Sequence, residues 1–345
     1  VEINKNSDNI NFIQKQIAAL ILGIIAITIL QFYDYSIVRE YSDLIYGATL
    51  ILLTLLLIYG TTKSGGKSWI LLGPINFQPS EITKLTVIFI LSKVMIDNKE
   101  ELKYLTGIFK TGFYALVPFV LIILQNDLGT ALVILFIYIV MLYTAGGNRK
   151  FILAIFGGGF LIIVLIIIAH FYLGTPLPFI REYQLNRLIV FVNPNLDPYG
   201  AGYNILQSKI ALGSGELFGK GLFAGTQNQL NFLPAKHTDF IFSVIGEEFG
   251  FVGVVAVLSL YLLLFWHMIK VAANARDDFA KLIVTGILAL FFFHVLQNIG
   301  MTMGVMPITG IPLPFISYGG SSMLTNFIAI AFVININVRK KKIMF

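Results

Sequence analysis

The chain has no cysteine, and only 12% of its 345 residues are charged. The first absence excludes disulfides, thiolate metal sites and a thiolate nucleophile. Soluble domains carry roughly 25% charged residues, whereas 57% of this chain is hydrophobic. We therefore predict an integral membrane protein. The net charge of +6 follows from membrane topology, as described next, and no nucleic-acid partner is expected.

Long apolar runs divide the chain into candidate membrane spans, since a helix crosses a bilayer with roughly 20 apolar residues. The predicted fold class is an all-α polytopic membrane protein with nine transmembrane helices. They lie near residues 17–32, 44–60, 80–96, 111–126, 128–145, 151–172, 240–268, 282–305 and 321–337.

The distribution of cations orients these spans. The connecting segments on one face contain 14 Lys or Arg, and the short segments on the other face contain four. By the positive-inside rule the richer face is cytoplasmic, so the chain ends inside and residues 1–16 lie outside. That first segment has no apolar run of its own to carry it across. We therefore expect one further span before it, and ten in the full protein.

Residues 173–239 are predicted to form a large extracytoplasmic loop within a single transmembrane domain, 1–345. A loop this long is usually functional or disordered. Its apolar patches LIVFV and ILQSKIAL favour an ordered loop with short helices lying against the membrane. We find no repeat of 20 to 50 residues and no separate soluble domain.

Three local patterns are interpreted as uninformative about function. SGGKS, residues 64–68, lacks the upstream glycine of a phosphate-binding loop, because position 61 is Thr. The Gly-rich run at 213–225 follows no buried strand, so we expect it to supply tight turns. The histidines His170, His267 and His294 are scattered singly, which argues against metal ligation.

Ionisable residues beside the apolar spans collect on the outer side. Charges placed near a hydrocarbon layer are costly and therefore mark functional candidates. Glu81 and Lys84, in QPSEITK, share one helix face at i, i+3 spacing. Asp127 occupies the short outer turn QNDLG. Two interpretations of Lys84 remain open: a structural ion pair with Asp127, or a group within a cavity.

The stretch LPAKHTDFIFSVIGEE, residues 233–248, adds a second group at the outer lip. Lys236, His237 and Asp239 precede a long span, and Arg187 lies in the outer loop. Asp239 suits an N-cap position, where a carboxylate accepts backbone N–H bonds, and a cap could also be catalytic. We interpret Glu247 and Glu248 as structural, on a partly hydrated helix face.

Five motifs occur in the order typical of one family: QPSEITK, QNDLGTA, NPNLDPYGAGYNILQSKIALGSGELFGKG, LPAKHTDFIFSVIGEEFGFVG and GIPLPFISYGGSS. Across nearly its whole length the chain resembles the SEDS (shape, elongation, division and sporulation) family, and GTQNQLNFLPAKHTDFIF resembles its elongation branch most. The resemblance implies a ten-helix peptidoglycan glycosyltransferase in the cytoplasmic membrane of a bacterium. Its substrate would be lipid II, an undecaprenyl-diphosphate-linked disaccharide-pentapeptide, polymerised on the extracytoplasmic face.

The resemblance also implies site residues and a partner. Asp239 matches the essential carboxylate of the family, and Lys84 and Asp127 match polar residues of its QPSE and QPDLG motifs. A class B penicillin-binding protein, a transpeptidase, is the implied partner. At two positions the chain departs from the pattern: Asn126 stands where the family usually has Pro, expected to alter only turn stiffness, and Asn76 where some relatives have Arg.

Glycan polymerisation needs a base, a cation for the leaving diphosphate and a groove for lipids. Asp239 is the expected base, and its pKa would be raised by burial and lowered by Lys236 and His237. For the diphosphate we expect Arg187 and Lys67, with Lys84 deeper. A divalent cation (Mg or Mn) could share this task, although no metal-ligand cluster or other cofactor is predicted. Two other functions stay open: a transporter of the lipid-linked precursor, and a noncatalytic scaffold.

Overall fold

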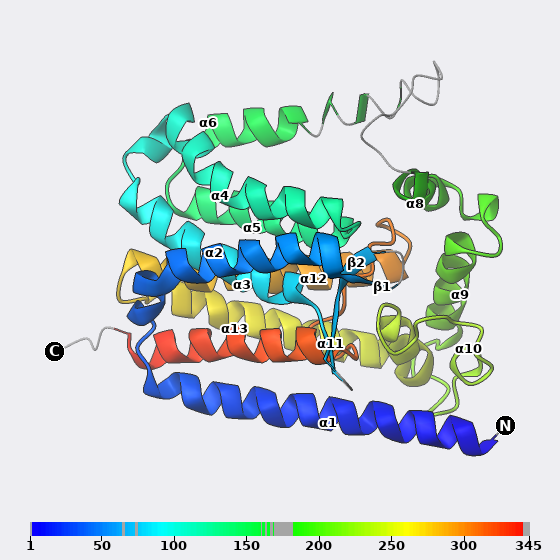
Figure 1. Ribbon diagram of the computed structural model, residues 1–345. Coiled ribbons are helices and arrows are strands. Elements are labelled where there is room, and N and C mark those ends of the chain that lie inside the picture. The colour runs from blue at the N-terminus through cyan, green and yellow to red at the C-terminus, as the bar shows by residue number, and fades with distance from the viewer. Residues whose placement is uncertain are drawn as a thin grey trace.

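The computed structural model describes residues 2–340, apart from 64–65, 73–74, 160, 163, 166–167 and 169–181. Its longer helices run almost side by side (Figure 1). They are α1 (Glu2–Phe32), α2 (Ser36–Tyr59), α3 (Pro79–Asp97), α4 (Leu105–Leu124), α5 (Leu128–Thr144), α11 (Ile241–Ala273), α12 (Asp278–Thr302) and α13 (Gly320–Val338). Shorter elements are α6 (Arg149–Ile152), α8 (Glu182–Val192), α9 (Ala201–Ser214), α10 (Thr226–Gln229), η1 (Glu101–Lys103), η2 (Leu153–Gly157) and η3 (Pro194–Leu196).

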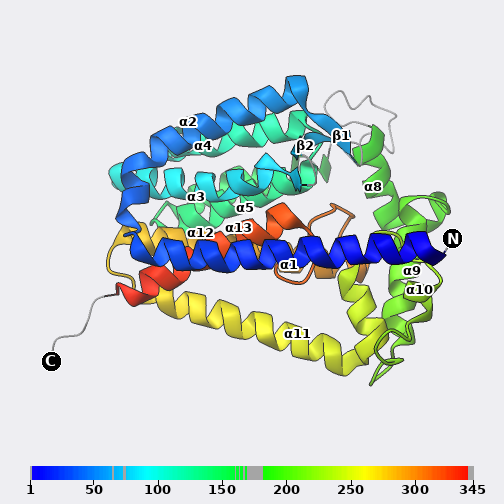
Figure 2. The ribbon, with the colours of Figure 1, turned by 60° about the horizontal axis from the view of Figure 1, so that its bottom comes forward.

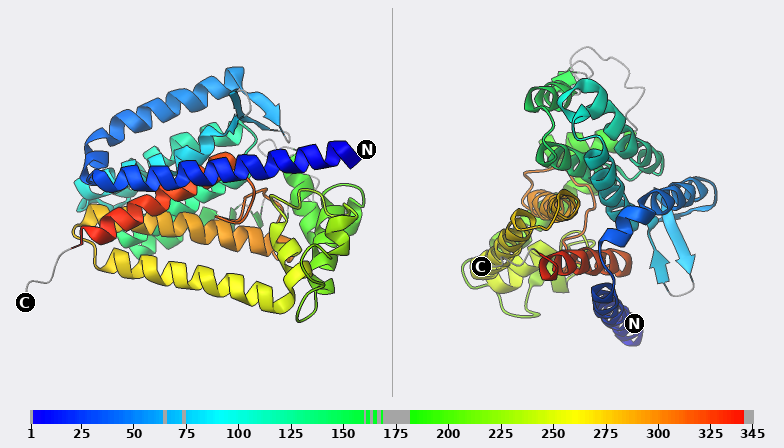
Figure 3. Two further views of the ribbon diagram at one scale, coloured as in Figure 1. Left: turned by 90° about the horizontal axis from the view of Figure 1, so that it is seen from below. Right: turned by 90° about the vertical axis from the view of Figure 1, so that its left-hand side faces the viewer.

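α3 and α12 form the centre of the bundle. α12 packs against α3, α5, α11 and α13, while α1 packs on α13 at the outside. Figure 3 shows this arrangement along the bundle. Gly286 permits a close approach, because a Cβ there would lie 2.7 Å from Ile88 of α3 and 2.9 Å from Met141 of α5. Two central helices with buried polar side chains thus meet at short distance.

The connections sort to two ends of the bundle, as the charge pattern predicts. The turns after α1, α3, α5 and α11 lie at the end where the chain terminates (Figure 1). Ion pairs join neighbouring elements there, at 2.8 Å for Arg39–Asp97 and 2.6 Å for Lys99–Asp278. The turn before α5, the segment before α13 and helices α8 to α10 lie at the opposite end (Figure 2).

Eight of the nine predicted spans lie on helices to within a few residues, but the span count of nine is not confirmed. Among the described residues, six helices are long and apolar enough to cross a membrane, and Leu128–Thr144 is a shorter apolar helix. α3 carries Glu81, Lys84, Lys93 and Asp97 within its 19 residues, which lowers its hydropathy. The predicted span 151–172 begins on α6 and η2, and most of its later part lies outside the described residues.

One feature departs from an all-helical expectation. β1 (Thr61–Lys63), β2 (Gly66–Leu72) and β3 (Ile75–Phe77) form a small antiparallel sheet in the order β1-β2-β3. The second half of SGGKS therefore belongs to a strand, which agrees with its exclusion as a phosphate-binding loop. The predicted short helices of the loop 173–239 are confirmed, because LIVFV lies in α8 and ILQSKIAL in α9.

Candidate active site

Asp239 lies in a tight turn immediately before α11. The backbone N–H groups of Thr238, Asp239 and Phe240 all donate to the carbonyl of Ala235, at 3.1 to 3.3 Å. Phe240, which is buried, is the N-cap residue, and no side chain caps this helix. The predicted capping role of Asp239 is therefore wrong. Its carboxylate is left available for other contacts because the turn has already satisfied the neighbouring backbone donors.

The segment between α12 and α13 holds this turn in place. The Asn298 side chain, fully buried in α12, donates to the carbonyl oxygens of Asp239 at 2.9 Å and Ile311 at 2.8 Å. The Ser317 hydroxyl donates to the Thr238 carbonyl at 2.6 Å. One amide thus fixes Asp239 relative to both α12 and the 303–319 segment.

The surroundings of the Asp239 carboxylate combine burial with one cation. Burial raises the pKa of Asp239, and a hydrogen bond from the Thr238 side chain and the charge of Arg187 oppose this rise. Arg187 Nη1 lies 3.5 Å from the carbonyl oxygen of Thr309. A Cβ at Gly310 would be 3.5 Å from Asp239 Oδ2, and φ is +74° there, so glycine suits the close approach.

A second polar group is buried between α3 and α12. Lys84 Nζ lies 2.8 Å from Glu81 Oε1 and 3.1 Å from His294 Nε2. His294 Nδ1 lies 3.1 Å from the carbonyl oxygen of Pro312, which can only accept. His294 must therefore donate from Nδ1 and accept from Lys84 at Nε2, as a neutral imidazole does.

These contacts correct two sequence interpretations. Lys84 pairs with Glu81, and the Lys84–Asp127 pair is wrong. His294, interpreted as an isolated histidine, is a partner of Lys84. No short-range pattern could have joined them, since more than 200 residues separate the two and only bundle packing brings α12 against α3.

Asp127 serves as the N-cap of α5 instead. Its carboxylate accepts from the Thr130 backbone N–H at 3.0 Å, from the Thr130 hydroxyl at 2.8 Å and from Gln78 Nε2 at 3.2 Å. A Cβ at Gly129 would lie 2.9 Å from the Thr309 carbonyl oxygen. The start of α5 therefore packs against the segment that faces Asp239, and Asp127 acts there by fixing backbone geometry.

The turn preceding Asp127 also differs from expectation. Asn126 has φ of +67°, a left-handed conformation that Asn tolerates and that the ring of Pro, fixed near −65°, excludes. The departure from the family pattern thus accompanies a different backbone conformation rather than only a change in stiffness.

The other predicted cations lie differently. Lys236 Nζ donates to the Asn228 carbonyl at 2.6 Å and to Asn231 Oδ1 at 2.8 Å. His237 is exposed, and its carbonyl accepts from the Tyr318 backbone N–H at 2.8 Å. Lys67 lies on β2, with its Cα opposite that of Thr62. Of the cations predicted to bind the diphosphate, Arg187 lies close enough for its charge to lower the pKa of Asp239.

Glu247 anchors the outer loop, so its structural role is confirmed. The predicted partly hydrated face is wrong, because Glu247 is 0% and Glu248 6% exposed. The buried Glu247 carboxylate accepts from Lys220 Nζ at 2.9 Å, from Thr226 Oγ1 at 3.2 Å, and from the backbone N–H groups of Gln227 at 2.9 Å and Asn228 at 3.2 Å. One acid from α11 thus organises residues 220–228.

We expect Glu247→Gln to loosen this loop. The amide would turn hydrogens toward donors, and hydrogen bonds to a charged group contribute about 1.5–3 kcal/mol each. Faster proteolytic cleavage within 213–232 would reveal the change. Glu248→Gln is the matched control, because within the described part of the chain the Glu248 carboxylate accepts one hydrogen bond, from Asn228 Nδ2, and Gln keeps that acceptor. Equal cleavage of both variants would contradict the anchor.

Several buried polar atoms around the site have no hydrogen-bond partner within the described part of the chain. They lie on α3, α12, α13 and the 303–319 segment, and they are Ser80 Oγ, Glu81 Oε2, Asn298 Oδ1, Thr309 Oγ1 and Thr325 Oγ1. Unpaired buried polar groups are costly, so ordered water is the natural partner of such atoms. The described residues contain no group of three or more His, Asp or Glu that could hold a metal ion.

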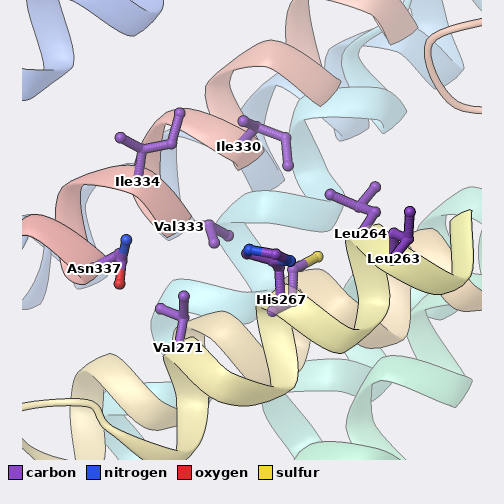
Figure 4. Close-up of a pocket in the computed structure, with 9 residues that line it drawn as sticks. Leu263, Leu264, His267, Val271, Ile330, Val333, Ile334 and Asn337 are labelled. Carbon is purple, nitrogen blue, oxygen red and sulfur yellow. The ribbon is translucent and has the colours of Figure 1, made fainter. Parts of the chain in front are cut away.

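An apolar pocket of about 330 Å³ lies elsewhere, between α11 and α13 (Figure 4). His267 and Asn337 are the only polar side chains in its lining, which otherwise consists of Leu263, Leu264, Met268, Val271, Ile330, Val333 and Ile334. It belongs to the half of α11 remote from Asp239 in sequence and contains no acid. It offers room for hydrocarbon, and His267 is the one titratable group in its lining.

Comparison with known proteins gives one family. Residues 2–342 match the FtsW/RodA/SpoVE family model, described as cell cycle protein. The peptidoglycan glycosyltransferase RodA of Treponema pallidum (strain Nichols) is 35% identical over 388 residues, covering 94% of this chain and 89% of the relative. The peptidoglycan glycosyltransferase MrdB of Escherichia coli (strain K12) is 34% identical over 340 residues, covering 97% and 88%.

Solved structures lead to the same result. One solved structure is described as structural coordination of polymerization and crosslinking by a peptidoglycan synthase complex. A chain of that structure matches this protein with a TM-score of 0.80 and 30% identity. The match covers 95% of this chain and 89% of that one. The motifs, the bundle and the matched length agree, so this multi-pass membrane protein belongs to the FtsW/RodA/SpoVE family.

Proposed function

We propose that the chain is a peptidoglycan glycosyltransferase that polymerises lipid II into glycan strands during cell elongation, with Asp239 as general base. The observation that carries this proposal is the partly buried Asp239 carboxylate, which lies beside Arg187 and is faced by Gly310, on a residue whose backbone carbonyl accepts from Asn298. The curated relatives named peptidoglycan glycosyltransferase support the reaction class.

The reaction joins a sugar hydroxyl of one lipid-linked substrate to the anomeric carbon of another and releases a lipid diphosphate. A base must accept the hydroxyl proton as the bond forms. Burial raises the pKa of Asp239 toward the working pH, which makes the carboxylate a stronger base than an exposed Asp. Arg187 opposes this rise, because its positive charge favours the ionised carboxylate.

The leaving diphosphate requires positive charge. Arg187 is our first candidate, since its side chain lies near both Asp239 and the Thr309 carbonyl. Lys84 contributes less direct attraction, because Glu81 already neutralises it at 2.8 Å. Lys84 instead supports the segment that faces Asp239, through His294 and Pro312. Lys67 remains a candidate from β2.

A divalent cation, Mg²⁺ or Mn²⁺, would find few protein ligands here. The described residues contain no group of three or more acids or histidines, so Asp239 would be the protein's contribution and diphosphate oxygens the other ligands. Such an ion would neutralise charge on the leaving diphosphate.

We place the site on the extracytoplasmic face, with residues 173–239 as an outer loop of one transmembrane domain. The support is the positive-inside rule together with the gathering of the basic connections at the other end of the bundle (Figure 1). A class B penicillin-binding protein is the proposed partner. The similarity to a peptidoglycan synthase complex that coordinates polymerization and crosslinking supports this choice.

The direct test incubates the purified chain, with and without its partner, with lipid II and sizes the glycan products. Elongated glycan is the expected product. A transporter would move lipid II across a vesicle membrane without forming glycan, and a scaffold would do neither. Either result from a folded preparation would overturn the proposal.

We expect Asn298→Leu to lower turnover without abolishing lipid binding. The change keeps a similar volume but leaves the Asp239 and Ile311 carbonyls unpaired, at a cost of about 1–3 kcal/mol, and misplacement near 1 Å costs about 100-fold in rate. Initial polymerisation rates at varied lipid II concentration measure kcat and KM separately.

The matched control is Gln297→Leu. Gln297 Nε2 donates to the Pro307 carbonyl at 2.8 Å, so this change removes one hydrogen bond to the same segment without touching the Asp239 turn. A kcat loss confined to Asn298→Leu supports positioning of Asp239. Equal losses in both variants would show that Asn298 only stabilises the fold.

A further inference from the structure

α11 is broken at Gly250, and a segment of the preceding loop fills the break. Gly250 has φ 66° and ψ −162°, which are not helical. Figure 2 shows the resulting bend, with the short portion before Gly250 turned away from the long portion after it. We call residues 215–223 the clip, because they pair with α11 on both sides of this glycine.

The clip replaces the helix's own hydrogen bonds. The carbonyls of Glu247 and Glu248 accept from the backbone N–H groups of Lys220 and Gly221, each at 3.0 Å. The N–H groups of Phe251 and Val252 donate to the carbonyls of Glu216 at 2.9 Å and Leu217 at 3.1 Å. In an unbroken helix these four groups would pair with one another at i, i+4 spacing.

Glycines make this pairing possible. A Cβ at Gly250 would lie 2.3 Å from the Gly219 nitrogen, and a Cβ at Gly219 would lie 2.1 Å from the Glu248 carbonyl oxygen. A Cβ at Gly215 would lie 1.8 Å from the Gly246 carbonyl oxygen. The Gly-rich run was predicted to supply turns, and it also permits backbone contact with α11.

The break lies close to one boundary of the hydrocarbon layer. The part of α11 after Gly250 runs from Phe251 to Ala273 and is about 34 Å long at 1.5 Å per residue. A bilayer core is roughly 30 Å thick, so this part alone spans it. The clip therefore lies at the membrane boundary, at the end of the bundle that carries Asp239.

The clip exposes large apolar side chains beside the exposed face of α11. Phe218 is 79% exposed, Phe223 72% and Leu222 61%. Phe251 and Val252, which pair with the clip through their backbones, are themselves exposed. Exposed apolar side chains therefore continue from α11 onto the clip.

Of the two charged side chains of the clip, Lys220 is satisfied within the protein and Glu216 is exposed. Lys220 Nζ turns to Thr226 Oγ1 at 2.8 Å and Glu247 Oε1 at 2.9 Å. The backbone bonds to α11 satisfy several groups that would be costly in lipid. An irregular segment with paired backbone groups and outward aromatic side chains suits a bilayer boundary.

We propose that the clip inserts Phe218, Leu222 and Phe223 into the acyl-chain region of the adjacent leaflet, which is the outer leaflet in the topology above. Phospholipid chains are the occupant, because the patch continues the lipid-facing surface of a membrane-spanning helix. The clip then fixes the height of the short helix Ile241–Phe249, and with it Asp239, relative to the lipid headgroups.

The chain's lack of cysteine permits a direct test. Phe218→Cys and Leu222→Cys are each labelled with a nitroxide, in the otherwise unchanged chain reconstituted in phospholipid nanodiscs. Electron paramagnetic resonance then compares collision with oxygen, which concentrates in lipid, and with a water-soluble nickel chelate. Leu262→Cys, on the exposed face of α11, is the lipid reference, and Tyr199→Cys, 97% exposed in the loop, is the water reference.

We expect both clip positions to resemble Leu262→Cys, with oxygen collisions exceeding nickel collisions. Values like those of Tyr199→Cys would overturn the proposal. Water-like values that become shielded from both reagents only after a partner protein is added would also overturn it, and would assign the patch to a protein interface. Because both side chains are highly exposed, the substitutions are not expected to disturb folding, and the test does not depend on catalytic activity.

Discussion

Asp239→Asn is expected to abolish glycan polymerisation while leaving the protein folded. The amide keeps nearly the same volume but cannot accept the proton of an attacking hydroxyl, and loss of a general base lowers rates by about 100- to 10,000-fold. Polymerisation of lipid II by the purified variant with its partner measures the rate. Size-exclusion chromatography and thermal unfolding measure the fold.

Asp43→Asn is the matched control, since Asp43 is an exposed acid near the start of α2, at the opposite end of the bundle. This variant should polymerise at the normal rate. Normal glycan formation by Asp239→Asn would remove Asp239 from the chemistry and with it the central assignment.

The pH profile of the unchanged chain gives an additional readout. A general base acts when deprotonated, so the rate should fall as the pH drops through the pKa of Asp239. Because burial raises this pKa above the ordinary value of 3.8, the fall should occur at a higher pH than for an exposed Asp. The residual rate of the Asp239→Asn variant should not show this fall.

Lys84→Met is expected to have the largest effect on stability. Removing the ammonium leaves Glu81 as a buried charge without its partner, and breaking a buried ion pair in this way costs about 3–5 kcal/mol. His294 also loses the donor to its Nε2. Thermal unfolding in detergent should show a large destabilisation, and polymerisation should be lost with it.

The double variant Glu81→Gln/Lys84→Met separates charge from packing. Removing both charges should recover much of the stability, because no buried ion remains unpaired. Lys93→Met is the surface control: Lys93 pairs with exposed Asp43, and such pairs contribute at most about 1 kcal/mol. If the double variant were as unstable as Lys84→Met, the Glu81 partnership would be the wrong explanation.

Sequence patterns with local physical causes were confirmed most fully. The apolar runs gave the positions of the long helices, because burying apolar length in a bilayer requires helix. The basic segments sorted to one end of the bundle, and Glu81 and Lys84 share a face because helical spacing sets it. The exact span count was not confirmed, since polar residues in α3 and the shortness of α5 lower their span signal.

Interactions between distant segments could not be predicted in the same way. Asp127 was expected to pair with Lys84, but its nearest donors are local ones at the start of α5, and Lys84 meets His294 of α12 instead. Asn298, Ser317 and Gly310 carried no separate signal. They matter only because the 303–319 segment folds back onto the turn of Asp239.

By itself the sequence determined a polytopic helical protein, the gathering of its basic connections on one side, and Asp239 as the candidate base, since hydropathy, charge counts and a contiguous motif are all read along the chain. Tertiary structure alone decided what holds that acid, that His294 contacts Lys84, and how the Gly-rich run supplies hydrogen-bond partners at the break in α11. Each of these depends on contacts between backbone or side-chain groups that lie far apart in sequence. Hydrogen-bond geometry and close packing impose that requirement only after the helices have assembled.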